Sequence, residues 1–84
     1  MKTYAVFFKN YNKIGAVLER VEDVTARWEE LQNQMGGDDW ADDEQVAAAL
    51  KEKTGADAVV HSADRAQAIL YAADACGIEG YIEG

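Results

Sequence analysis

The fold of this chain is determined above all by six residues near its beginning, Tyr4-Ala5-Val6-Phe7-Phe8-Lys9. Their aromatic and β-branched side chains predict a β-strand. Because successive strand residues point to opposite faces of a sheet, the unbroken apolar run over 4–8 puts apolar groups on both faces. We therefore expect this strand to lie centrally in a sheet. The run is too short for a signal sequence or a membrane span, so we expect a cytoplasmic protein.

A second strand is expected over residues 14–21, joined to the first strand by a hairpin. The connecting residues 10–13 belong to types that favour turns. Regular alternation then divides the side chains of the second strand between the two faces of the sheet. One face is expected to carry Ile14, Ala16 and Leu18, and the other Val17, Glu19 and Val21.

A first helix is predicted after this hairpin by apolar residues at helical spacing. The apolar stripe consists of Val24, Trp28, Leu31 and Met35. Asp23 or Thr25 can cap the start of the helix. Gly36-Gly37 is expected to end it.

A second helix is predicted over residues 43–53. Asp42, followed by Gln45 three residues later, resembles a capping box at its start. Its acidic residues lie in the first turn and its lysines in the last, which is the arrangement that the helix dipole favours.

Three further elements complete the chain, namely a strand, a helix and a last strand over 56–61, 63–76 and 78–82. Ser62 is the expected N-cap of this third helix, and Gly77 is expected to stop it. The element order is ββααβαβ. The 84 residues suffice for one domain, spanning 1–84. We expect an α+β two-layer domain with a three- or four-stranded sheet and helices on one face.

Acidic residues are concentrated in one part of the chain. The segment 19–44 holds ten acids and two bases, and its net charge of −8 equals that of the whole chain. The acids are Glu19, Glu22, Asp23, Glu29, Glu30, Asp38, Asp39, Asp42, Asp43 and Glu44. This charge argues against direct binding to nucleic acid or to an anionic membrane. It favours a basic protein surface as the partner, although solubility alone is an alternative explanation.

Residues suited to catalysis or metal binding are sparse. Cys76 is the single cysteine, which excludes an internal disulfide and a cysteine-built zinc site. The acidic segment lacks the EF-hand spacing, so we expect no metal ion and no cofactor. We expect structural roles for His61 and Ser62, and a core position for Cys76. No third group completes a Cys76–His61 dyad, and we expect no enzymatic activity.

The two tryptophans occupy different settings. Trp28 belongs to the apolar stripe of the first predicted helix and is expected in the core. Trp40 follows two aspartates and precedes two more. It either packs the entry to the second helix as a hydrophobic staple or anchors an interface ringed by charge. Tyr11, in the predicted turn, could extend such an interface.

The segment Gly36-Gly37-Asp38-Asp39-Trp40-Ala41-Asp42-Asp43-Glu44 lies in a small, acidic, proline-free chain. In size, charge and overall character the chain resembles phage-encoded anti-CRISPR proteins, above all inhibitors of type I multi-subunit complexes. The resemblance implies that the chain blocks DNA or RNA binding in the cytoplasm of a bacterial host. It also implies Cas subunits as partners.

The leading hypothesis is therefore a monomeric, non-enzymatic inhibitor whose carboxylates replace nucleic-acid phosphates on a basic target surface. The partner-binding residues would be the ten acids of 19–44, with Trp40 or Tyr11 adding apolar contact. The alternative is a small cytoplasmic regulatory or accessory module, which uses its acidity for solubility and binds through an apolar surface.

Overall fold

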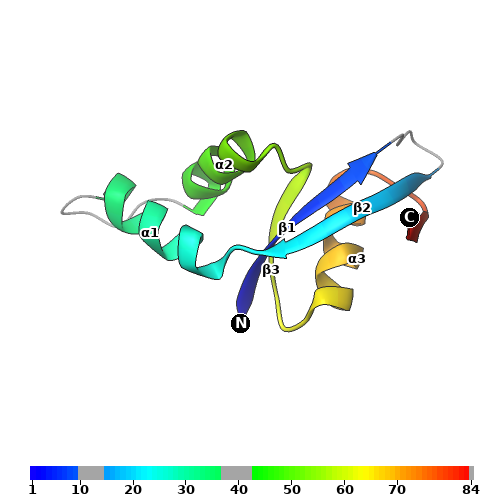
Figure 1. The fold of residues 1–84 in the computed structure, drawn as a ribbon, viewed down its shortest axis with the longest axis horizontal. Coiled ribbons are helices and arrows are strands. Elements are labelled where there is room, and N and C mark those ends of the chain that lie inside the picture. Colours follow the sequence, from blue (N-terminus) through cyan, green and yellow to red (C-terminus); the bar gives the residue numbers. More distant parts are fainter. Residues whose placement is uncertain (10–14, 37–42, 84) are drawn as a thin grey trace.

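The computed structural model describes residues 1–9, 15–36 and 43–83, which form a small α+β domain (Figure 1). The elements are β1 (Lys2–Lys9), β2 (Ala16–Asp23), α1 (Thr25–Gly36), α2 (Asp43–Thr54), β3 (Ala58–Ser62), α3 (Arg65–Ala75) and β4 (Tyr81–Glu83). This order confirms the predicted ββααβαβ arrangement. The four strands form one mixed sheet in the order β3-β1-β2-β4.

Strand β1 lies inside the sheet, as its apolar run predicts. It pairs antiparallel with β2 on one side and with β3 on the other, whereas β4 runs parallel to β2. All residues from Thr3 to Phe8 are buried. The central position agrees with this composition, because apolar side chains on both faces of a strand are best shielded from water in the interior of a sheet.

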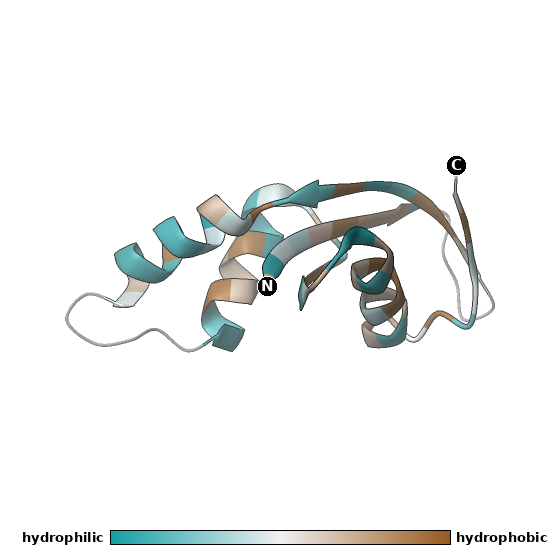
Figure 2. Ribbon diagram, turned by 90° about the horizontal axis from the view of Figure 1, so that it is seen from below, coloured by the Kyte–Doolittle hydropathy of each residue, from teal (hydrophilic) through white to brown (hydrophobic). Residues whose placement is uncertain are grey.

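The helices cover both faces of the sheet, so the expectation of helices on one face is wrong. Ala5 and Phe7 of β1 pack in one cluster with residues of α1 and α2. Val6 and Phe8, which point the opposite way, pack in a second cluster with residues of α3. Two separate small cores therefore lie on either side of β1. In Figure 2, α1 is coloured mostly as hydrophilic, which agrees with the exposure of most of its residues.

A β-bulge explains why the predicted faces of the second strand are only partly right. Phe7 pairs with Arg20 but Phe8 pairs with Leu18, which leaves Glu19 as an extra residue in β2. Beyond the bulge the alternation is reversed. Val21 consequently packs in the same cluster as Leu18, although regular alternation predicts opposite faces.

The ends of α3 also differ from the prediction. The N-cap is Asp64 rather than Ser62, because the Asp64 carboxylate accepts a hydrogen bond from the Gln67 N–H at 2.8 Å. Ser62 is instead fully buried, with its hydroxyl 2.8 Å from the Asp64 carbonyl oxygen. At the other end, Gly77 has a φ of 70°, and the Ile78 N–H donates to the Ala73 carbonyl at 2.9 Å. This Schellman motif places Ile78 in the core, so the last strand begins later than expected.

The remaining boundaries lie close to those predicted. Val24, Trp28 and Leu31 are buried as the apolar stripe indicates, whereas Met35 at the end of α1 is 44% exposed. Ala58 and Val60 of β3 face the α3 side, and Val59 faces the α1–α2 side. The capping box expected at Asp42 lies outside the described residues.

Candidate functional site

The predicted partner-binding residues that the structure describes are all exposed. Glu19, Glu22 and Asp23 lie on β2, Glu29 and Glu30 on α1, and Asp43 and Glu44 in the first turn of α2. We use the term acidic surface for Glu22, Asp23, Glu29, Glu30, Asp43 and Glu44. Tyr11, Asp38, Asp39, Trp40 and Asp42 lie outside the described residues.

Asp23 forms the junction between β2 and α1. Its Oδ1 accepts hydrogen bonds from the Thr25 hydroxyl at 2.6 Å and from the Thr25 N–H at 3.0 Å. Its Oδ2 lies 3.8 Å from Lys2 Nζ. These hydrogen bonds, above all that from the Thr25 hydroxyl, lower the pKa of Asp23. Of the two residues predicted to cap α1, Asp23 is therefore the one whose side chain accepts a hydrogen bond from the first N–H of the helix.

Thr25 connects this junction to the central strand. Its hydroxyl oxygen accepts a hydrogen bond from the backbone N–H of buried Thr3 at 2.9 Å. The Thr3 carbonyl in turn accepts from the Val24 N–H at 2.8 Å. The start of α1 is therefore fixed to β1 through the backbone of Thr3.

A second attachment of α1 runs through His61 of β3. The Thr3 hydroxyl lies 2.9 Å from His61 Nδ1. The His61 ring meets Trp28 of α1 edge-to-face, with ring centroids 4.4 Å apart and an interplanar angle of 88°. Such aromatic pairs contribute about 0.5–1.5 kcal/mol beyond the burial of their surface. His61 thus has the structural role that the sequence suggests, holding α1 against the sheet.

Arg20 engages two of the acids on β2. Its guanidinium lies 3.5 Å from a Glu19 carboxylate oxygen and 3.4 Å from one of Glu22. It also covers the face of the Phe7 ring, with Arg20 Cζ 3.9 Å from the ring centroid. A cation at this distance from an aromatic face is attracted by the quadrupole of the ring. Part of the negative charge on β2 is therefore compensated within the molecule.

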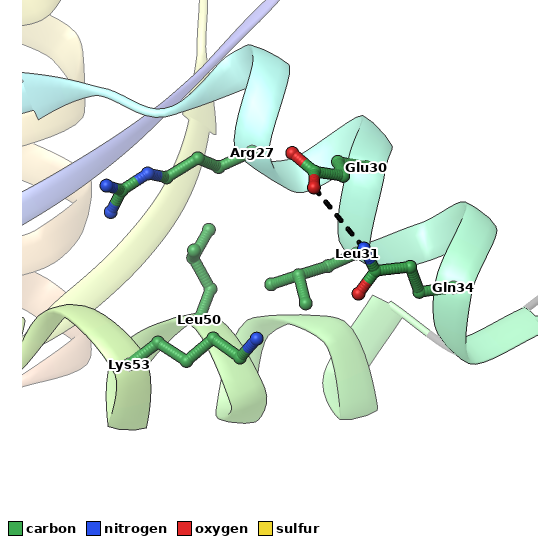
Figure 3. A pocket seen from close by; sticks show the side chains of 6 residues that line it. All are labelled: Arg27, Glu30, Leu31, Gln34, Leu50 and Lys53. Atoms are coloured by element: carbon green, nitrogen blue, oxygen red, sulfur yellow. Dashed lines mark hydrogen bonds between the residues drawn. The ribbon is translucent and has the colours of Figure 1, made fainter.

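A groove of about 340 Å³ lies between α1 and α2 (Figure 3). Leu31 and Leu50 point into the space between the helices, and Arg27 and Lys53 extend beside them. Glu30, at the rim, accepts a hydrogen bond from the Gln34 side chain at 3.3 Å. Two leucines and charged side chains of both signs therefore line this groove.

The structure separates the groups from which a catalytic dyad could be built. His61 contacts Trp28 on the α1–α2 side of the sheet, whereas Cys76 packs in the cluster on the α3 side. The Cys76 thiol lies 3.7 Å from the Asp57 carbonyl oxygen. Partial burial raises the pKa of Cys76, and the charge of Asp57 adds to this effect. The raised pKa disfavours the thiolate form, and the Cys76 thiol and the His61 ring pack on different sides of the sheet.

Within residues 1–9, 15–36 and 43–83, no group of acids, histidines and cysteines is arranged to hold a metal ion. In the same part of the chain, no helix has the length and apolar character required to cross a membrane.

Sequence reasoning named Thr25 only as a possible helix cap, and it did not identify the roles of Thr3 and Arg20. The contact between Thr3 and Thr25 joins residues 22 positions apart, and its partners become apparent only after the strands have paired. The alternation of Glu19, Arg20 and Glu22 in one strand is the signal that could have indicated an internal ion pair.

No protein-family model, curated protein or solved structure matches this chain.

Proposed function

We propose that this chain is a non-enzymatic inhibitor that binds a basic, nucleic-acid-binding surface of a target protein complex. The observation that carries the proposal is the acidic surface, whose carboxylates are all exposed along the end of β2, α1 and the start of α2. The sequence between α1 and α2 adds Asp38, Asp39 and Asp42.

The acidic surface is poorly compensated around α1. Arg27 is the single cation in the sequence of α1, and no ion pair within the described residues joins Glu29 or Glu30 to a cation. Like charges held close together destabilise a small domain by self-repulsion. A basic partner would relieve this repulsion, and binding such a partner would explain why acidic residues are concentrated around α1.

The attachment of α1 supports a binding role. Its start is fixed by Asp23 and Thr25, and its buried face is held by the Trp28–His61 contact. Side chains on a helix fixed in this way lose less conformational freedom when a partner binds. The carboxylates would then take the place of phosphates opposite lysine and arginine residues of the target, and the association would weaken with rising salt concentration.

The resemblance to anti-CRISPR proteins makes a type I complex the first target to test. The assay measures binding of a labelled DNA duplex to a purified type I surveillance complex while the concentration of this chain is raised. The test variant carries Glu22→Gln, Glu29→Gln and Glu30→Gln. A matched control removes the same charge elsewhere through Glu52→Gln, Asp74→Asn and Glu79→Gln.

We expect inhibition of DNA binding that weakens with salt, and a loss of potency of about tenfold or more for the test variant only. A second variant, in which Asp38, Asp39 and Asp42 are changed to Asn, tests the segment between the helices. Equal potency of the wild-type chain and both acid variants would refute the acidic surface as the binding site. If the type I complex is not inhibited at all, capture from a bacterial lysate followed by salt elution tests for other basic targets.

One observation favours the alternative of an accessory module that binds through an apolar surface. Leu70 and Tyr71 of α3 are 60% and 48% exposed, and Ile82 of β4 is 67% exposed. These residues lie outside the acidic surface. Under this alternative, Leu70→Ser abolishes partner binding and the acid variants leave it unchanged, whereas the inhibitor predicts the reverse.

A further inference from the structure

Strand β3 forms an edge of the sheet. Among the strands that the structure describes, it pairs with β1 alone. Its sequence Ala58-Val59-Val60-His61-Ser62 contains neither proline nor lysine, the residues that most often protect an exposed edge from pairing. The backbone of β3 is thus suited to receive another strand.

A groove of about 530 Å³ adjoins this strand. Residues of α2 line one part of it, the first residues of β3 another, and the end of α3 a third. These residues include Ala47, Ala48, Val59, Val60, Ala75 and Cys76. Because most of the side chains are small and apolar, the backbone of another chain can approach β3 closely.

The α2 side of the groove carries charges in a self-complementary order. Glu44 and Lys51 both line the groove, and Ala47 and Ala48 lie between them. Seven residues correspond to about 10 Å along a helix, so the two charges are separated by two turns. A two-fold axis passing between Ala47 and Ala48 would bring Glu44 of each copy opposite Lys51 of the other. Such reciprocal contacts are the defining property of an interface between identical subunits.

We propose that the β3 edge and its groove bind a second copy of this chain. In the resulting homodimer, the two β3 strands pair antiparallel and the two sheets become continuous. The two α2 helices face each other with reciprocal Glu44–Lys51 ion pairs. This interface shares Glu44 with the acidic surface but contains no residue of α1. The inhibition test changes Glu22, Glu29 and Glu30, which lie outside the groove, so the dimer and the proposed function can fail independently. It replaces the expectation of a monomer.

Charge reversal provides a sharp test of this dimer. Glu44→Lys alone brings two lysines together at each contact, and Lys51→Glu alone brings two glutamates together. An equimolar mixture of the two variants restores opposite charges at both contacts of the heterodimer. Asp43→Lys and Lys53→Glu serve as controls, because they make the same changes in the same turns of α2 outside this groove.

Analytical ultracentrifugation over a wide range of concentrations measures the dissociation constant, and circular dichroism checks that each variant is folded. We expect each single reversal to raise the dissociation constant about tenfold or more, and the mixture to return close to the wild-type value. Both controls should match the wild-type protein. A wild-type chain that remains monomeric up to about 1 mM, or a mixture no tighter than the single variants, would overturn the proposal.

A measurement on the wild-type protein makes the test independent of the folding of the variants. Backbone amides of β3 that pair with the second copy exchange their hydrogens more slowly when the protein is concentrated than when it is dilute. Exchange at residues 58–62 that does not depend on concentration would count against the second copy as the occupant. In that case an extended segment of another protein would be the next occupant to test.

Discussion

The Thr25 hydroxyl is the group on which the placement of α1 depends most directly. It accepts a hydrogen bond from the Thr3 N–H at 2.9 Å and donates one to Asp23 at 2.6 Å. The substitution Thr25→Val removes both hydrogen bonds but keeps a β-branched side chain of nearly the same shape. Thr3 is only 3% exposed, so its N–H then loses its acceptor in a place that water reaches poorly.

The expected cost follows from this buried N–H. An unsatisfied buried donor costs about 1–3 kcal/mol, a substantial part of the free energy of unfolding of a small domain. Each kcal/mol corresponds to a decrease in Tm of about 4–8 °C for a domain of this size. Thr25→Ser is the matched control, because it keeps the hydroxyl and removes one methyl group at a cost of at most about 1 kcal/mol.

Urea denaturation followed by circular dichroism gives the free energy of unfolding of the three proteins. An NMR titration of Asp23 provides a second measurement at the same site. The Thr25 hydroxyl contributes most to lowering the pKa of Asp23, so this pKa should rise in Thr25→Val and stay low in Thr25→Ser. Equal stability of the two variants, together with an unchanged Asp23 pKa in both, would refute the proposed junction.

Four further predictions concern charge, core, backbone and thiol. The folded-state pKa of Asp23 is lowered, so its charge stabilises the fold above the unfolded-state pKa. The urea midpoints of wild type and Asp23→Asn should therefore differ at neutral pH and converge as the pH falls through the lowered folded-state pKa. Leu50→Ala should cost about 2–5 kcal/mol by urea denaturation, since this side chain is 1% exposed. Gly77→Ala should lower the stability by about 1–2 kcal/mol because φ is positive, whereas Gly80→Ala, with no atom in the way of a Cβ, should be neutral. Cys76 should react slowly with iodoacetamide near neutral pH, because its raised pKa leaves little thiolate. Its reaction rate should rise only at a pH higher than the one at which an ordinary cysteine becomes reactive.

Local patterns predicted the elements and their order because those patterns are set by nearest neighbours in sequence. Val24, Trp28 and Leu31 follow helical spacing, and burial of this stripe is confirmed. The arrangement of the helices on both faces of the sheet was not predicted, although the apolar residues on both faces of β1 indicated it. An apolar run on both sides of a strand requires a covering layer on each side, and α3 provides the second layer.

Other features could not be predicted because they depend on pairing between distant residues. The bulge at Glu19 arises from the fit between β1 and β2, and it reverses which side chains of β2 reach the core. The contact between Trp28 and His61 joins a helix to a strand across more than thirty residues of sequence. For the candidate site, the exposure of the acids could be predicted from their solvation, but their internal partners could not.

These internal partners change which acidic residues support the proposal of a basic binding partner. Arg20 already lies beside Glu19 and Glu22, where its placement is also favoured by the Phe7 ring, so the charge of β2 has a role inside the domain. Asp23 likewise has a structural role at the start of α1. Within the described residues, Glu29 and Glu30 form no ion pair, and Glu30 contacts only the neutral Gln34 side chain among the hydrogen bonds of α1. The case for a basic partner therefore rests on α1 and the segment that follows it, rather than on the total charge of the chain.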